Sequence, residues 1–191
     1  PYRSKKQVTA QIERVLAEIE GAKVVVKVHS KMIRAALAVD GASIQIEANV
    51  DTECPSVAVP TAAFALRQGQ PSRLVRVMDL DRALAHKLAA WNERRLVRDL
   101  YDIYYLSARL GARPDVAALR RRLAKVESRL PTLRNRRSMP MREFLAALRD
   151  ATGALEAVSV RDELAPILPH DELVGLVPRI RAAVIKVLEE L

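Results

Sequence analysis

The pattern of apolar and polar residues changes character near residue 79. Before that point, apolar residues alternate with polar ones or form short β-branched runs, as in strands. Asp40-Gly41 separates two of these runs and is a strong signal for a two-residue hairpin turn. After residue 79, apolar residues recur every three or four positions, as in helices. We therefore expect an α+β fold, with strands at residues 23–28, 34–39, 43–50 and 74–78.

Helices are predicted on both sides of this small sheet. Residues 1–20 carry apolar positions at helical spacing, and Gly21 follows as a stop signal. Residues 51–78 contain several prolines and are predicted to be loop with short strands. Prolines mark the joints between the later helices, and Pro178 is expected to kink the last one. These later helices are predicted at residues 80–94, 97–110, 115–129, 140–151, 160–168 and 171–190.

One predicted strand has two chemically different faces. In 43–50, the residues on one face are apolar, which suits packing on a helix. The opposite face is polar and could line a cleft, with Glu47 at its centre. The apolar face consists of Ile44, Ile46, Ala48 and Val50, and the polar face of Gln45, Glu47 and Asn49.

Composition excludes several classes of protein. Half of the 191 residues are apolar, so the chain can bury a core. No apolar run approaches the about 20 residues of a membrane span, and the basic first residues predict no signal peptide. Cys54 is the only cysteine, which excludes an intrachain disulfide and favours the cytoplasm. Pro1 fits either the loss of an initiator Met or a start further upstream.

Positive charge is concentrated in one stretch. The chain carries a formal charge of +9, and residues 109–142 hold eleven Lys and Arg against two acidic residues. Such density is typical of a surface that binds a polyanion. A solvated helix face is the alternative. The three adjacent arginines 120–122 cover more than half a helical turn, so at least one must point into the bundle or to a partner.

Two neighbouring helices place charged residues on their apolar sides. On a helical wheel, Lys87 falls inside the apolar arc of 80–94, and Asp99 falls on the apolar side of 97–110. Asp102 lies on the polar side. The two helices are therefore expected to face each other across a shared polar site. Alternatively, Lys87 snorkels, Asp99 favours the helix dipole, and Asp102 is a solvated acid.

The same residues carry a family resemblance. The strand and helix at 77–91, with Lys87-Leu88-Ala89-Ala90, and the Arg98-Asp99-Leu100-Tyr101-Asp102 helix resemble the AbiEii/AbiGii nucleotidyltransferase toxins. In that family, a K-x-x-A helix precedes an R-D-x-x-D helix. Ile46-Glu47 is similar to the family's "I-E" strand. The resemblance spans about residues 43–106, and 111–191 resembles only a generic helical tail.

The resemblance implies residue roles. Lys87 and Arg98 would hold a nucleoside triphosphate, and Asp99 and Asp102 would orient Lys87 or the nucleotide as catalytic residues. Glu47 would lie at a Mg²⁺ site, because such transfer uses metal-bound carboxylates. It also implies two domains: residues 1–78, the remainder of a nucleotidyltransferase-like α/β domain, and residues 79–191, a helical domain.

The sequence departs from the family in one motif. The family places a Gly-Ser turn and an Asp-x-Asp strand before the region matched here, and neither occurs before Glu47. Asp79-Leu80-Asp81 has the spacing but is better interpreted as a helix N-cap.

Three functions remain open. The first is a toxin that transfers a nucleoside monophosphate to RNA, at the tRNA 3′ acceptor end, and that has a cognate antitoxin. The second is a catalytically impaired or truncated module of the same fold that binds RNA or antitoxin. The third is a helical scaffold, which leaves Lys87 and Asp99 unexplained. The predicted RNA contacts are Arg120, Arg121, Arg122, Arg134, Arg136 and Arg137.

Overall fold

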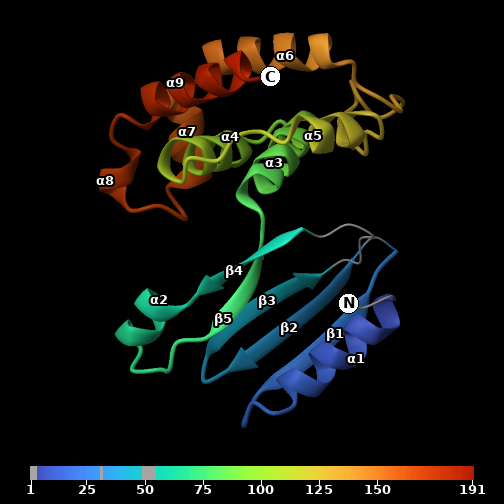
Figure 1. Cartoon of the computed structure of the whole chain (residues 1–191), viewed down its shortest axis with the longest axis vertical. Helices are drawn as coiled ribbons and strands as arrows, with labels where there is room; N and C mark the ends of the chain where they lie inside the picture. The colour runs from blue at the N-terminus through green and yellow to red at the C-terminus, as the bar shows by residue number, and fades with distance from the viewer. Residues whose placement is uncertain (1–3, 31, 49–54) are drawn as a thin grey trace. The chain divides into compact units, whose positions relative to one another are not determined.

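The computed structural model describes residues 4–30, 32–48 and 55–191, and its contacts divide the chain into two compact units, Pro1–Cys54 and Pro55–Leu191. The first unit is a helix followed by a three-stranded antiparallel sheet of order β1-β2-β3 (Figure 1). The predicted helix and strands are confirmed, although residues 1–3 and 49–50 lie outside the described residues. Their bounds are α1 (Lys5–Leu16), β1 (Lys23–Val28), β2 (Ile33–Val39) and β3 (Ala42–Ala48).

Alternation along β2 builds the core of this unit. Ala35 and Leu37 point to the same side and pack against Leu16 of α1. The predicted β2–β3 turn is confirmed, since Asp40 and Gly41 both have positive φ, 49° and 78°. The predicted packing of the apolar face of β3 holds only in part. Ile46 is half-buried, but Ile44 is 58% exposed because α1 lies mainly against β1 and β2.

The second unit begins with a hairpin. Strands β4 (Ser56–Pro60) and β5 (Leu74–Met78) pair antiparallel, and the short helix α2 (Ala62–Arg67) lies between them. The ladder continues to Asp79, whose N–H donates to the carbonyl of Pro55 at 3.3 Å. The Asp79 carboxylate then accepts from two backbone N–H groups of the next helix, which confirms the predicted N-cap.

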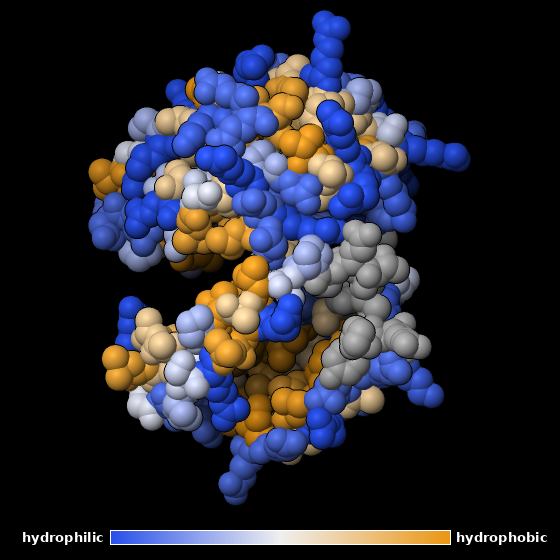
Figure 2. All heavy atoms as spheres, in the orientation of Figure 1, coloured by the Kyte–Doolittle hydropathy of each residue, from blue (hydrophilic) through white to orange (hydrophobic). Residues whose placement is uncertain are grey.

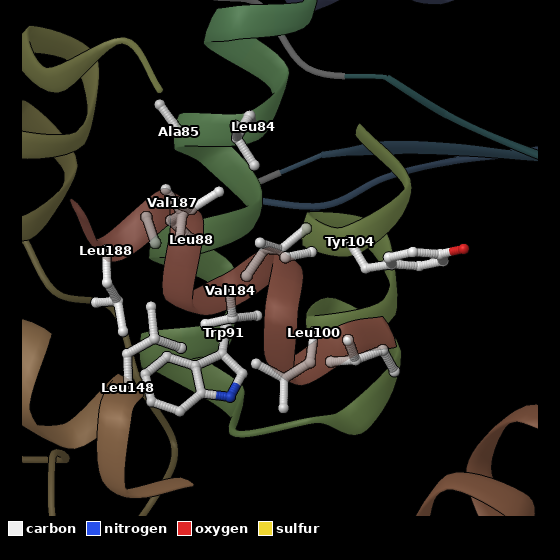
Figure 3. Packing of buried hydrophobic residues seen from close by; sticks show 14 of the residues in the cluster. Leu84, Ala85, Leu88, Trp91, Leu100, Tyr104, Leu148, Val184, Val187 and Leu188 are labelled. Carbon is white, nitrogen blue, oxygen red and sulfur yellow. The ribbon is translucent and has the colours of Figure 1, made fainter. Parts of the chain in front are cut away.

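The rest of the second unit is helical, and no strand follows Met78 in residues 79–191, which the structure describes in full. Trp91 is buried and meets Phe144 edge to face at 6.1 Å. Figure 3 shows Trp91 beside Leu148, in a core that α9 also lines. The elements are α3 (Leu80–Arg94), α4 (Val97–Tyr104), a π-helical turn η1 (Tyr105–Arg109), α5 (Val116–Leu123), α6 (Met141–Gly153), α7 (Ala157–Leu164), α8 (His170–Leu173) and α9 (Leu176–Glu189).

Three helix predictions were wrong in their bounds, one of them the helix predicted at 160–168, which is α7 at Ala157–Leu164. The helix predicted at 115–129 ends at Leu123, because backbone hydrogen bonds from Met139 to Leu123 and from Val126 to Arg137 hold the following residues in another conformation. The helix predicted at 171–190 is broken at Gly175, which has a φ of 65°. Pro178 therefore lies in the first turn of α9, where its missing N–H leaves no gap, and produces no kink.

Across the described residues, no helix has the length and apolar character needed to cross a membrane.

Candidate functional site

Lys87 on α3 and Asp102 on α4 form an ion pair. The distance from Lys87 Nζ to Asp102 Oδ2 is 2.5 Å, and the two side chains are 40% and 35% exposed. The predicted approach of Lys87 to an acid of the next helix is therefore confirmed. Lys87 lies at the edge of the apolar stripe rather than fully inside it, so its ammonium remains accessible to a ligand.

Asp99 is buried, as predicted, but its partner is Arg94 rather than Lys87. The Asp99 side chain is 1% exposed, and both of its carboxylate oxygens accept hydrogen bonds from Arg94, one of them from Nε at 3.2 Å. A buried carboxylate requires a compensating charge, and this bidentate pair supplies it. Asp99 thus joins the end of α3 to the first turn of α4.

Residues without a local signal in the sequence orient α4. Arg95, between the helices, adopts the left-handed conformation with φ 58° and stacks on Trp91 at 4.2 Å. Burial lowers the pKa of Arg95, and the nearby Glu143 opposes that shift. Glu163 of α7 accepts hydrogen bonds from the backbone N–H of Val97 at 3.2 and 3.1 Å. Glu163 lies 66 residues after Val97, so no local sequence pattern predicts this cap.

Arg98 is exposed on the first turn of α4. It precedes Asp102 by four residues, so both lie on the same side of the helix. The guanidinium of Arg98 is therefore a second cation, one helical turn from the Lys87–Asp102 pair, that a ligand bound at this pair could contact.

Glu47 belongs to the first unit. On the face of the sheet opposite α1, its carboxylate accepts hydrogen bonds from Arg34 at 2.8 Å and from Gln45 at 3.0 Å. The register places Arg34 directly across from Glu47. The proximity of Glu47 to Lys87 joins residues of two units and stays a prediction.

The described residues do not assemble a metal centre. Among them, no three or more His, Cys, Asp or Glu side chains are grouped as ligands, and Glu47 is bound to Arg34. Mg²⁺ usually needs oxygen ligands and charge from more than one carboxylate. This part of the chain therefore does not fit a complete Mg²⁺ site, and the metal stays a prediction.

The basic stretch divides between core and surface. Arg122 donates to both carboxylate oxygens of Glu93, at 3.0 and 3.1 Å, which confirms that one of the three adjacent arginines points into the bundle. Nη1 and Nη2 of Arg136 each donate to a carboxylate oxygen of Glu143, Nη2 at 2.7 Å. This hydrogen bonding lowers the pKa of Glu143. The other predicted RNA contacts are exposed: Arg120, Arg121, Arg134 and Arg137.

Among the comparisons with known proteins, one family model matches nearly the whole chain. No curated protein and no solved structure matches it. A family model described as nucleotidyl transferase AbiEii toxin, type IV TA system, matches residues 3–184. The similarity thus extends well beyond the expected 43–106 and includes the helices that looked generic. The chain belongs to the AbiEii family of nucleotidyl transferase toxins of type IV toxin–antitoxin systems.

Proposed function

We propose that this chain transfers a nucleoside monophosphate from a nucleoside triphosphate to RNA, with the tRNA 3′ acceptor end as the substrate. The observation that carries the proposal is the half-exposed Lys87–Asp102 pair, which lies on the two helices that resemble the family's K-x-x-A and R-D-x-x-D motifs. In the reaction, an RNA hydroxyl oxygen bonds to the α-phosphorus, the bond to the pyrophosphate breaks, and the hydroxyl proton is lost.

Lys87 is the triphosphate-binding residue in this proposal. Its ammonium is a compact charge with three donors, which suits phosphate oxygens. Asp102 holds Nζ at the surface until the nucleotide arrives. A triphosphate carries more negative charge than one carboxylate, so it can displace Asp102 from Nζ. Arg98, one turn away, would then contact the nucleotide as well.

For Asp99 we propose a role that differs from the expected catalytic one. Because both of its oxygens are bound to Arg94, we propose that it positions α4 and does not touch the nucleotide. Asp102 is then the acid that orients Lys87. Mg²⁺ is the proposed cofactor, and the cytoplasm, which holds nucleotides and tRNA, is the proposed location. We also propose that the cognate antitoxin is a protein.

The decisive experiment is incorporation of labelled nucleotide into tRNA, with Mg²⁺ and with EDTA. We expect Mg²⁺-dependent labelling by the wild type and a loss of about a hundredfold or more in Lys87→Ala, because a charge that neutralises phosphate is removed. Lys186→Ala, which removes an exposed lysine of α9, is the control and should retain activity.

A second candidate follows from the lack of a metal cluster among the described residues. In it, the chain is a non-catalytic module of the same fold that binds RNA or the antitoxin. A wild-type chain that binds tRNA but labels it no faster than Lys87→Ala does would establish this alternative and remove the enzymatic proposal.

A further inference from the structure

The arginine-rich stretch between α5 and α6 is a closed loop with fixed ends. At its base, the N–H of Met139 donates to the carbonyl of Leu123 at 2.8 Å, and the N–H of Val126 donates to the carbonyl of Arg137 at 2.9 Å. Leu133, near its tip, is buried in the helical core. Residues 124–140 therefore form a closed loop (Figure 1) that is held at its base by backbone hydrogen bonds and anchored in the core by Leu133, and not a loose linker.

Glu93 of α3 anchors the first half of this loop. Its carbonyl accepts a hydrogen bond from Ser128 Oγ at 2.6 Å, and its carboxylate accepts from the N–H of Glu127 at 3.4 Å. The same carboxylate holds Arg122. In the second half, Arg136 binds Glu143 of α6. Arg122 and Arg136 are therefore neutralised by the chain's own acids and hold the loop in place.

The remaining arginines of the loop present their charge to solvent. Arg129, Arg134 and Arg137 are exposed, and none of them forms an ion pair within the described residues. Hydrophilic residues dominate the surface over this loop (Figure 2). A fixed loop that displays three free guanidinium groups loses little conformational freedom when it binds a polyanion.

Arg129 also has space beside it. It lines an open cavity of about 450 Å³ with the apolar side chains of Leu96 and Leu130, and Glu93, Arg94 and Glu127 complete the lining. Single-stranded RNA can place an unstacked base or a sugar against such apolar side chains while its phosphate meets a guanidinium. The combination therefore favours RNA.

We infer that the loop 124–140 is the surface on which RNA docks, and that Arg129, Arg134 and Arg137 contact its phosphates. Arg122 and Arg136, two of the expected RNA contacts, instead hold the loop in shape. This inference rests on the proposed function, since it concerns the RNA that would accept the nucleotide.

The test compares two variants of equal net charge by titrating labelled tRNA at several salt concentrations. One replaces Arg129, Arg134 and Arg137 by Gln. The control replaces three arginines that are exposed elsewhere in the same unit, Arg67, Arg149 and Arg161. We expect the loop variant to bind at least tenfold more weakly, with the slope of log K against log salt smaller by about 2 to 3. The control should keep the wild-type slope.

Several outcomes would overturn the inference. Equal losses of tRNA affinity in both variants would mean that binding depends only on net charge. An unchanged affinity of the loop variant would mean that the RNA binds elsewhere. Loop-dependent binding of poly-L-glutamate as tight as that of tRNA would make the loop a docking surface for acidic protein. If the triple variant fails to fold, each single replacement is titrated, and the three slopes should each fall by roughly 0.7 to 0.9.

The labelling assay separates this inference from the proposed function. A loop variant that labels tRNA with an unchanged KM for tRNA would remove the docking surface and leave the transfer reaction intact. A wild type that binds tRNA through the loop but transfers no nucleotide would keep the docking surface and remove the proposed transfer reaction.

Discussion

Asp99 and Asp102 lie one turn apart on α4, yet their surroundings give them different tasks. Asp99 is 1% exposed and bound by Arg94, whereas Asp102 is 35% exposed and bound to Lys87. A buried carboxylate that loses its charge leaves its partner uncompensated, while a half-exposed one is readily replaced by water. The R-D-x-x-D motif therefore combines a fixed positioning acid with an accessible one.

This difference predicts different stabilities for two matched variants. Asp99→Asn should lower the free energy of unfolding by about 1–3 kcal/mol, since charged hydrogen bonds inside the protein are lost. Asp102→Asn should change it by less than about 1 kcal/mol, as expected for a half-exposed pair. Urea denaturation followed by Trp91 fluorescence measures both. Equal losses would contradict the division of roles.

For individual residues, the sequence predicted the face of the helix on which a charged side chain lies, but not the residue with which it pairs. A helical wheel placed Asp99 on the apolar side, where it is buried, and Lys87 inside the apolar arc, whereas its side chain is 40% exposed at the edge of that arc. It could not show that Arg94 pairs with Asp99, because that contact depends on the left-handed conformation of Arg95. Non-glycine residues seldom adopt this conformation, so the turn between the helices had no local signal.

The helix α4 depends on a residue distant in sequence for its N-terminal cap. It has no side-chain cap of its own, and Glu163 of α7 supplies the acceptors for its first N–H groups. A carboxylate at a helix N-terminus also interacts favourably with the helix dipole. The orientation of α4, and with it the place of Asp102, is therefore coupled to α7.

Removing this cap should loosen the start of α4. We expect Glu163→Ala to destabilise the protein by about 1 kcal/mol. Amide hydrogen exchange at Val97 and Arg98 should accelerate, while the middle of α3 should stay protected. Asp162→Ala removes the neighbouring exposed acid and serves as the control. The capping role fails if both variants exchange at the wild-type rate.

Element types were more predictable than their ends. The strands β1, β2, β3 and β5 and the helix α3 follow directly from periodicity and turn residues. The end of α5 did not, because Glu93 and Met139 hold the following backbone through tertiary contacts. The short β4 and α2 lie in a proline-containing segment whose pattern was too brief to assign.

For the whole molecule, the two units have cores of unequal size. Leu16, Ala35 and Leu37 form the buried cluster of the first unit, together with half-buried neighbours. The core of the second unit runs through α3, α4, α6 and α9. Stability rises with buried apolar area, so the first unit should open at a lower free energy.

This inequality can be measured because Trp91, the single tryptophan, lies in the larger core. We expect amides of β1–β3 to exchange before those of α3 and α9. In urea, far-UV circular dichroism should begin to change at lower concentration than Trp91 fluorescence does. Coincident transitions and uniform exchange would mean that the chain unfolds as one cooperative block.

Asp79 fixes the rotation of α3 about its own axis relative to the β4–β5 hairpin. Its N–H ends the β4–β5 ladder at Pro55, and its carboxylate starts α3. Each residue of an α-helix turns the chain by about 100°. One residue inserted between Asp79 and Leu80 would therefore turn the Lys87 side of α3 by more than a quarter turn relative to the hairpin. Lengthening is thus better tolerated at the far end of the hairpin, around Gly69, than at this joint.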